Sequence, residues 1–131
     1  MSEAPILRIV LQRHDMDCAV AVLAMLCGVA YEEALIAISA EAPNVLRHGV
    51  HLRPLQRAAI RLGFRLRSKR TYDLEAETGG LQVQSDQWKV DHLVVLREGL
   101  IVETDGLLWE AETFFTANAA TPGALYVAEA L

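Results

Sequence analysis

Cysteines and long apolar runs are scarce in this sequence, and both absences narrow the class of protein. The two cysteines, Cys18 and Cys27, are too few for a disulfide framework. If both lie on one helix, its rise separates them by about 13 Å, beyond the reach of a disulfide. The apolar run between them is too short to span a bilayer. Internal repeats and low-complexity tracts are also absent, which excludes a repeat protein.

Length and composition indicate one folded domain. A chain of 131 residues is long enough for one core and too short for two, so we assign residues 1–131 to a single domain. With 53% hydrophobic and 22% charged residues, the composition is that of a globular protein rather than a disordered one. The net charge of -5 argues against a nucleic-acid partner.

The apolar run 18–27 could instead belong to a secretory signal, with Arg8 and Arg13 as its basic region and a small-residue cleavage site after it. Two acidic residues argue against this interpretation, because Asp15 and Asp17 directly precede the run. We therefore expect a cytoplasmic protein without a membrane segment, or one exported by a route that does not use such a signal.

The most informative residue is Cys18, at the head of the apolar run. We expect a helix to start there, with Asp17 capping it or bracing the loop before it. A thiol at a helix start feels the positive end of the helix dipole and free backbone N–H groups, which favour the thiolate. Downstream, His92 could pair with that thiolate and Asp105 could orient the ring. Gln12 could donate a side-chain N–H to an oxyanion. The alternative for each is a plain structural role.

A predicted β-hairpin gives a physical reason for an imidazole and a carboxylate to meet. Its two strands are expected at 92–97 and 100–105, joined by a two-residue loop. In that register His92 stands opposite Asp105 in a non-hydrogen-bonded pair, where side chains approach most closely. A three-residue loop would place Thr104 there instead. Glu103 is the poorer candidate, because it would lie opposite Val94.

The other elements are predicted from apolar periodicity and helix caps. Further helices are expected over 17–28, 31–39, 52–62 and 109–115, and further strands over 64–67 and 124–128. Residues 71–87 read as a loop with short extended pieces, and Gly79-Gly80 as a flexible point rather than a self-cleavage site. These elements predict an α+β domain in which N-terminal helices pack on a small antiparallel sheet.

The order and spacing of these residues resemble a known enzyme family. Gln12 is followed by Asp17-Cys18-Ala19, His92-Leu93-Val94-Val95-Leu96 and Asp105-Gly106. This arrangement resembles papain-like cysteine peptidases, and most of all the peptidase domain that trims double-glycine leader peptides from bacteriocins. That family typically has Gly and Pro where this sequence has Ala19 and Gly106. The resemblance covers roughly residues 11–131, and it implies a papain-like fold and leader-type peptides as a substrate class.

We therefore predict a cysteine hydrolase that cleaves a peptide or amide bond and uses no cofactor. The nucleophile, the acid and base, the orienting acid and the oxyanion donor are expected to be Cys18, His92, Asp105 and Gln12. An acyltransferase, in which an amine replaces water, is one alternative. The departures at Ala19 and Gly106 motivate another, a catalytically inactive module that binds peptides on the same scaffold.

Two further groups of residues have more than one interpretation. His48 and His51 have the spacing of two metal ligands on one turn, but no third ligand is evident, so we predict no metal site. Arg53, Arg57 and Arg61 form a stripe at i, i+4 and i+8 of a predicted helix. A solvated helix face is the commoner role for such a stripe, and docking of an acidic partner is the alternative.

Overall fold

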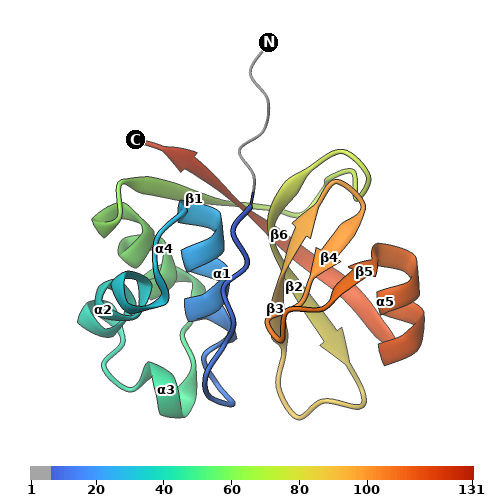
Figure 1. Ribbon diagram of the computed structural model, residues 1–131, viewed down its shortest axis with the longest axis horizontal. Helices are drawn as coiled ribbons and strands as arrows, with labels where there is room; N and C mark the ends of the chain where they lie inside the picture. Colours follow the sequence, from blue (N-terminus) through green and yellow to red (C-terminus); the bar gives the residue numbers. More distant parts are fainter. Residues whose placement is uncertain (1–6) are drawn as a thin grey trace.

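The computed structural model describes residues 7–131, which form a group of helices beside a six-stranded antiparallel sheet (Figure 1). The helices are α1 (Cys18–Cys27), α2 (Tyr31–Glu41), α3 (Val45–His48), α4 (Leu52–Arg61) and α5 (Ala111–Asn118). The strands are β1 (Phe64–Lys69), β2 (Thr78–Ser85), β3 (His92–Arg97), β4 (Leu100–Val102), β5 (Leu108–Glu110) and β6 (Ala120–Ala130). The predicted α+β class, with N-terminal helices packed on an antiparallel sheet, is confirmed.

The sheet has the strand order β1-β6-β2-β3-β4-β5. Helices α1 to α4 gather on one side of the molecule, and α5 lies at the opposite end of the sheet (Figure 1). Helix α1 packs directly against β2 and β3, so the start of α1 and the start of β3 belong to neighbouring elements. This packing brings the two halves of the candidate site together.

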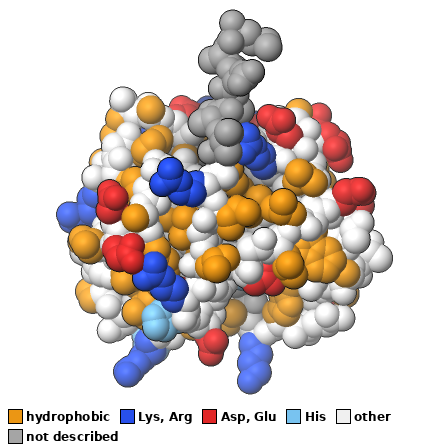
Figure 2. Space-filling model, viewed as in Figure 1, with side chains coloured by type: hydrophobic (Ala, Val, Ile, Leu, Met, Phe, Trp, Pro, Cys, Tyr) orange, Lys and Arg blue, Asp and Glu red, His pale blue; other side chains and the backbone are white. Residues whose placement is uncertain are grey.

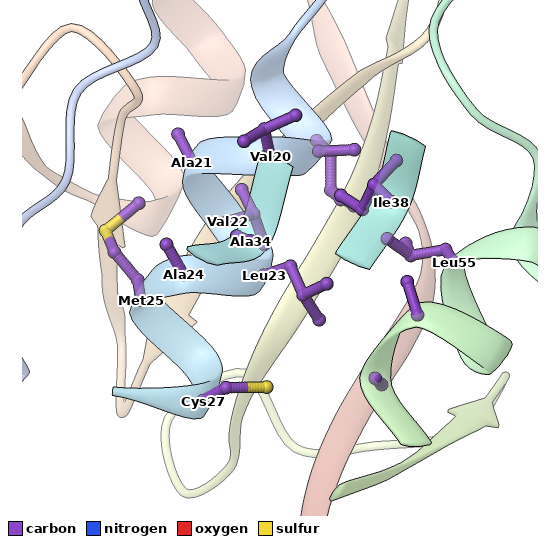
Figure 3. Close-up of a cluster of buried hydrophobic side chains, with 14 of the residues drawn as sticks. Val20, Ala21, Val22, Leu23, Ala24, Met25, Cys27, Ala34, Ile38 and Leu55 are labelled. Carbon is purple, nitrogen blue, oxygen red and sulfur yellow. The ribbon is translucent and has the colours of Figure 1, made fainter. Parts of the chain in front are cut away.

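Helix α1 is the centre of the larger hydrophobic core. Its residues are apolar on every side, which predicts a helix that is buried all round. The structure buries every residue of α1 except Cys18 and Leu26, and α1 packs against α2 and α4 through Leu23, Ile38 and Leu55 (Figure 3). Burial also raises the pKa of the Cys27 thiol to about 12, so this cysteine acts as a small apolar side chain.

The predicted loop over 71–87 is wrong, because it contains the central strand β2. Gly79 and Gly80 lie inside this strand and permit close packing rather than flexibility. A Cβ at Gly79 would lie 2.6 Å from the carbonyl oxygen of Tyr126, and one at Gly80 would lie 3.1 Å from Cγ1 of Val22. Glycine therefore lets strand β6 and helix α1 approach β2 from either side.

The predicted two-residue turn of the hairpin is confirmed. Arg97 pairs with Leu100, and the loop residues Glu98 and Gly99 have φ angles of 46° and 86°. Positive φ at both central residues is the signature of a type I′ turn, which matches the twist of the flanking strands. The register over β3 and β4 is therefore the one that the sequence predicts.

The second strand of this hairpin ends earlier than predicted. Strand β4 stops at Val102, and a turn follows in which the N–H of Gly106 donates to the carbonyl of Glu103 at 2.9 Å. The N–H of Glu103 then donates to the carbonyl of Leu107 at 2.9 Å, and the chain reverses into β5. The last strand, β6, is in turn longer than the predicted 124–128.

Within residues 7–131, no single helix has both the length and the apolar character that crossing a membrane requires. Helices α1 and α2 meet those limits only as a pair, and a bend of 117° separates them.

Candidate active site

The loop before α1 fixes the position of Cys18. Asp17 is fully buried, and its carboxylate accepts hydrogen bonds from the backbone N–H groups of Arg13 and His14, each at 3.0 Å, and from the hydroxyl of Tyr31. Asp17 makes no side-chain capping bond to α1, so it braces the loop rather than capping the helix. Cys18 follows as the first helical residue, half-buried, with a backbone N–H that has no partner inside the helix.

His92 opens β3 and reaches Cys18 across the junction between α1 and the sheet. Its ring forms a hydrogen bond with the Cys18 side chain, and its Nε2–H donates to Oε1 of Glu103 at 2.6 Å. Burial opposes protonation of the ring, but these hydrogen bonds and the nearby negative charges outweigh it and raise the pKa of His92 to about 10. The Trp88 ring packs edge-on against the imidazole with centroids 5.6 Å apart.

The carboxylate beside His92 is Glu103, and the next residue secures it. The backbone N–H of Thr104 donates to Oε1 of Glu103 at 2.8 Å, and the Thr104 hydroxyl lies 3.1 Å from the same oxygen. Burial raises the pKa of Glu103, but the hydrogen bonds from His92 and Thr104 and the charge of His92 outweigh it, so the pKa is lowered. Glu103 therefore stays ionised and can hold His92 as an imidazolium.

The structure brings Glu103, not Asp105, to His92, which corrects the predicted pairing. The register would have set Asp105 opposite His92 only if β4 had continued for three more residues. Instead Asp105 lies exposed in the turn, where its Oδ1 accepts a hydrogen bond from the N–H of Leu107 at 2.9 Å. Asp105-Gly106 is itself a turn sequence, and Gly106 has a φ of 93°. That signal indicated that the strand would end before Asp105.

Gln12 lies on the extended segment before α1, which runs between the helices and the sheet (Figure 1), and it is not one of the residues that line the pocket with Cys18. Its backbone N–H donates to the carbonyl of Thr104 at 2.9 Å. Its side-chain Oε1 accepts from the Thr104 hydroxyl, and its Nε2 donates to the carbonyl of His14 at 2.6 Å. Gln12 therefore contacts Thr104, the residue that follows Glu103 in the chain, and Glu103 in turn binds His92.

Cys18, His92 and Glu103 line a pocket of about 700 Å³. The helical side of the pocket is lined mainly by Ala19, His48, Val50, His51, Leu52 and Leu55. The side formed by the sheet and the β2–β3 loop is lined mainly by Gln82, Trp88, Asp91 and Tyr126. In residues 7–131, no three His, Cys, Asp or Glu side chains are grouped so that they could hold a metal ion. A pocket between two walls can take a chain segment beside the thiol.

The arginine stripe on α4 is partly neutralised within the molecule. Arg57 and Arg61 both contact the carboxylate of Glu41 on α2, each at 2.7 Å, and they lower the pKa of that carboxyl. Figure 2 shows charged side chains of both signs spread over the face in view, without one dominant patch. Ion pairing accounts for two members of the stripe, and an acidic partner at Arg53, Arg57 and Arg61 stays a prediction.

Comparison with known proteins identifies the fold. No protein-family model and no curated protein sequence matches this chain. A solved structure does match, the crystal structure of a double glycine motif protease from an AMS/PCAT transporter in complex with the leader peptide. The match covers 95% of this chain and 92% of that one, with a TM-score of 0.65 and 19% sequence identity.

The chain has a papain-like cysteine peptidase fold. At 19% identity the likeness establishes the fold alone, and it confirms the resemblance that the sequence order indicates.

Three residues near the site escaped sequence analysis: Glu103 as the partner of His92, Thr104 as the residue that holds Glu103, and Trp88 as the ring that covers the imidazole. Glu103 was weighed and set aside because in an unbroken strand it would lie opposite Val94 rather than opposite His92. The early end of β4 removes that objection. Nothing in the sequence marks Trp88 as a neighbour of His92, because the contact depends on how the β2–β3 loop folds back.

Proposed function

We propose that this protein is a cysteine peptidase that cleaves a peptide or amide bond through Cys18 and His92. The observation that carries the proposal is the chain of contacts from Cys18 to His92 to Glu103 beside an open pocket. A thiol at a helix start, a base with a raised pKa and a half-buried carboxylate are the parts that nucleophilic catalysis by cysteine needs.

The proposed reaction starts from a Cys18 thiolate paired with the His92 imidazolium. The sulfur attacks the substrate carbonyl carbon, and the developing oxyanion is held by the Cys18 backbone N–H and by a side-chain N–H of Gln12. His92 then gives its proton to the leaving amine, which departs and leaves a thioester on Cys18. A water molecule loses a proton to His92 and attacks the thioester, which releases the acid and restores the ion pair. Glu103 orients His92 throughout.

We further propose that the substrate is a leader-type peptide with a double-glycine motif. The support is the structural neighbour, a double glycine motif protease in complex with a leader peptide, whose chain matches this one over almost its full length. The pocket beside Cys18 is bounded by a helical wall in which His48 and His51 join apolar side chains, and by a wall from the sheet and the β2–β3 loop that carries Gln82 and Asp91. An extended segment lying in such a pocket presents its backbone to the thiol.

Site-selective alkylation tests the nucleophile. We expect iodoacetamide at neutral pH to label Cys18 much faster than the buried Cys27, which serves as an internal control in the same molecule. His92→Ala should slow labelling of Cys18 by about tenfold or more, because it removes the cation beside the sulfur. Equal labelling of the two cysteines, or a rate indifferent to His92, would contradict the proposed ion pair.

Cleavage of synthetic peptides tests the reaction and the substrate class. Peptides that carry a Gly-Gly pair should be cut after the second glycine, and matched peptides with Ala-Ala should not. Cys18→Ala should abolish cleavage.

Mass spectrometry in the presence of an added amine identifies the acceptor: free acid alone indicates hydrolysis, whereas an amide product indicates acyl transfer. Binding of the Gly-Gly peptide without turnover by the wild-type protein would indicate a peptide-binding module instead.

A further inference from the structure

We infer that Thr104 is a positioning residue whose hydroxyl ties the proposed oxyanion donor Gln12 to the carboxylate Glu103 that orients His92. The inference rests on the proposed function, since it assigns the residue that organises the same site. Thr104 is 1% exposed and is, with Asp17, one of two buried polar or charged side chains in residues 7–131. A hydroxyl buried to that extent needs partners.

Thr104 contacts both neighbours through backbone and side chain. Its N–H donates to Oε1 of Glu103 at 2.8 Å, and its carbonyl accepts from the N–H of Gln12 at 2.9 Å. Its hydroxyl bonds Oε1 of Gln12 and lies 3.1 Å from Oε1 of Glu103. One residue therefore joins the segment before α1 to the end of β4.

The chemistry of the partners fixes the direction of these bonds. The carbonyl of His14 can only accept, so the Gln12 amide must turn its Nε2 toward His14 and its Oε1 toward Thr104. Both acceptors of the Thr104 hydroxyl, the Gln12 amide oxygen and the Glu103 carboxylate, lack a proton of their own. The single hydroxyl proton is therefore shared between them, and the hydroxyl sets the positions of both groups.

The groups that titrate around Glu103 are few. His92 faces it from β3, and Cys18 on α1 lies beyond His92. On its own loop, Asp105 turns its carboxylate to the N–H of Leu107. Thr104 lowers the pKa of Glu103 through its N–H and its hydroxyl. Loss of the hydroxyl should therefore make Glu103 easier to protonate and should move the acid-side loss of activity to higher pH.

The test compares Thr104→Val, which keeps the shape and removes the hydroxyl, with Thr104→Ser, which keeps the hydroxyl. Thr116→Val, at an exposed position on α5, is the matched control. Two measurements are made across pH 3–9, a range that includes the pH region below 4.5 where Glu103 takes up its proton: the alkylation rate of Cys18 by iodoacetamide, and kcat and KM on a Gly-Gly peptide. We expect Thr104→Val to lower kcat and alkylation by about tenfold, with KM changed less than about twofold. The acid-side limb of the pH–rate profile of Thr104→Val should move to higher pH by about half a unit.

Thr104→Ser should behave as wild type in both measurements, and Thr116→Val likewise. Thr104→Val with wild-type rates and limb would overturn the inference. So would a serine variant as impaired as the valine variant at unchanged melting temperature, because that result assigns the effect to packing. If the wild-type protein cuts no peptide, the proposed peptidase function fails on its own. The alkylation rates then still decide the role of Thr104.

Discussion

Nε2 of His92 lies 2.6 Å from Oε1 of Glu103, in a pair that is largely withdrawn from solvent. The two side chains come from β3 and from the first residue after β4, and a type I′ turn sets their register. The second ring nitrogen is left for Cys18, which is how one imidazole can serve a thiol and a carboxylate together.

Replacement of either candidate carboxylate separates the roles of Glu103 and Asp105. Glu103→Gln keeps the shape but removes the charge that holds the imidazolium, so the pKa of His92 should fall toward its ordinary value of 6.5. We expect the proposed peptidase activity to drop by about a hundredfold. Asp105→Asn keeps an oxygen for the Leu107 N–H and should stay within about threefold of wild type.

NMR titration of the His92 ring and kcat/KM on one peptide substrate measure both effects. The reverse ranking, with Asp105→Asn inactive and Glu103→Gln active, would restore the pairing that the sequence register predicts.

The raised pKa of His92 makes folding stability depend on pH. The ring binds its proton more tightly when folded, with a pKa near 10, than when unfolded, with a pKa near 6.5. Its stabilising contribution is therefore complete below pH 6.5 and is lost as the pH rises through 10. Urea unfolding of wild type and His92→Gln at several pH values should show the advantage of wild type shrinking by on the order of 1–3 kcal/mol over that range. A constant difference would mean that the ring is not protonated in the fold.

The close approach of β6 to β2 depends on the absence of a side chain at Gly79. Gly79→Ala places a methyl group 2.6 Å from the backbone oxygen of Tyr126, which cannot rotate away. We expect a loss of about 2–3 kcal/mol in the free energy of unfolding. At Gly80 the nearest atoms belong to the side chains of Val22 and Leu26, so Gly80→Ala should cost less, about 1 kcal/mol. Equal losses, measured by urea unfolding, would contradict this account.

The hairpin turn places a glutamate where the backbone favours asparagine. Glu98 has a φ of 46°, a left-handed conformation that costs an ordinary side chain energy and that asparagine tolerates better. Glu98→Asn should therefore raise the free energy of unfolding by about 0.5–1 kcal/mol. Glu98→Val, which is β-branched, should lower it. Thermal unfolding ranks the three proteins, and an asparagine variant less stable than wild type would show that the glutamate side chain has a contact of its own.

Short-range signals predicted much of the fold. Helix α1 was predicted to within one residue at each end from its apolar run, the aspartate before it and the glycine after it. This is possible because the residue preferences at helix ends depend on the neighbouring sequence. The hairpin register was predictable too, since a two-residue loop fixes which residues face each other. Strand β2 was not, because a glycine pair reads as flexible until the strand and the helix that pack on it are known.

The candidate site shows the same division. Cys18 and His92 stand at element starts that the sequence marks, and the structure places their side chains in contact. The orienting carboxylate depends on where β4 stops, and the turn after Val102 decides that. The predicted strand is three residues longer than β4, and that difference decides whether Asp105 or Glu103 is the partner of His92. The prediction of the orienting acid failed because the end of strand β4 was placed too late, and not because the wrong residue types were considered.

The hydroxyl of Thr104 donates a hydrogen bond to Gln12, a residue that precedes it by 92 positions in the sequence. During synthesis the ribosome therefore delivers the thiol long before the histidine and the acid that would activate it. Until the sheet has emerged, Cys18 is an ordinary thiol on a nascent polypeptide, with no more reactivity than a free cysteine. A site assembled in this order stays incomplete while the chain is still being made.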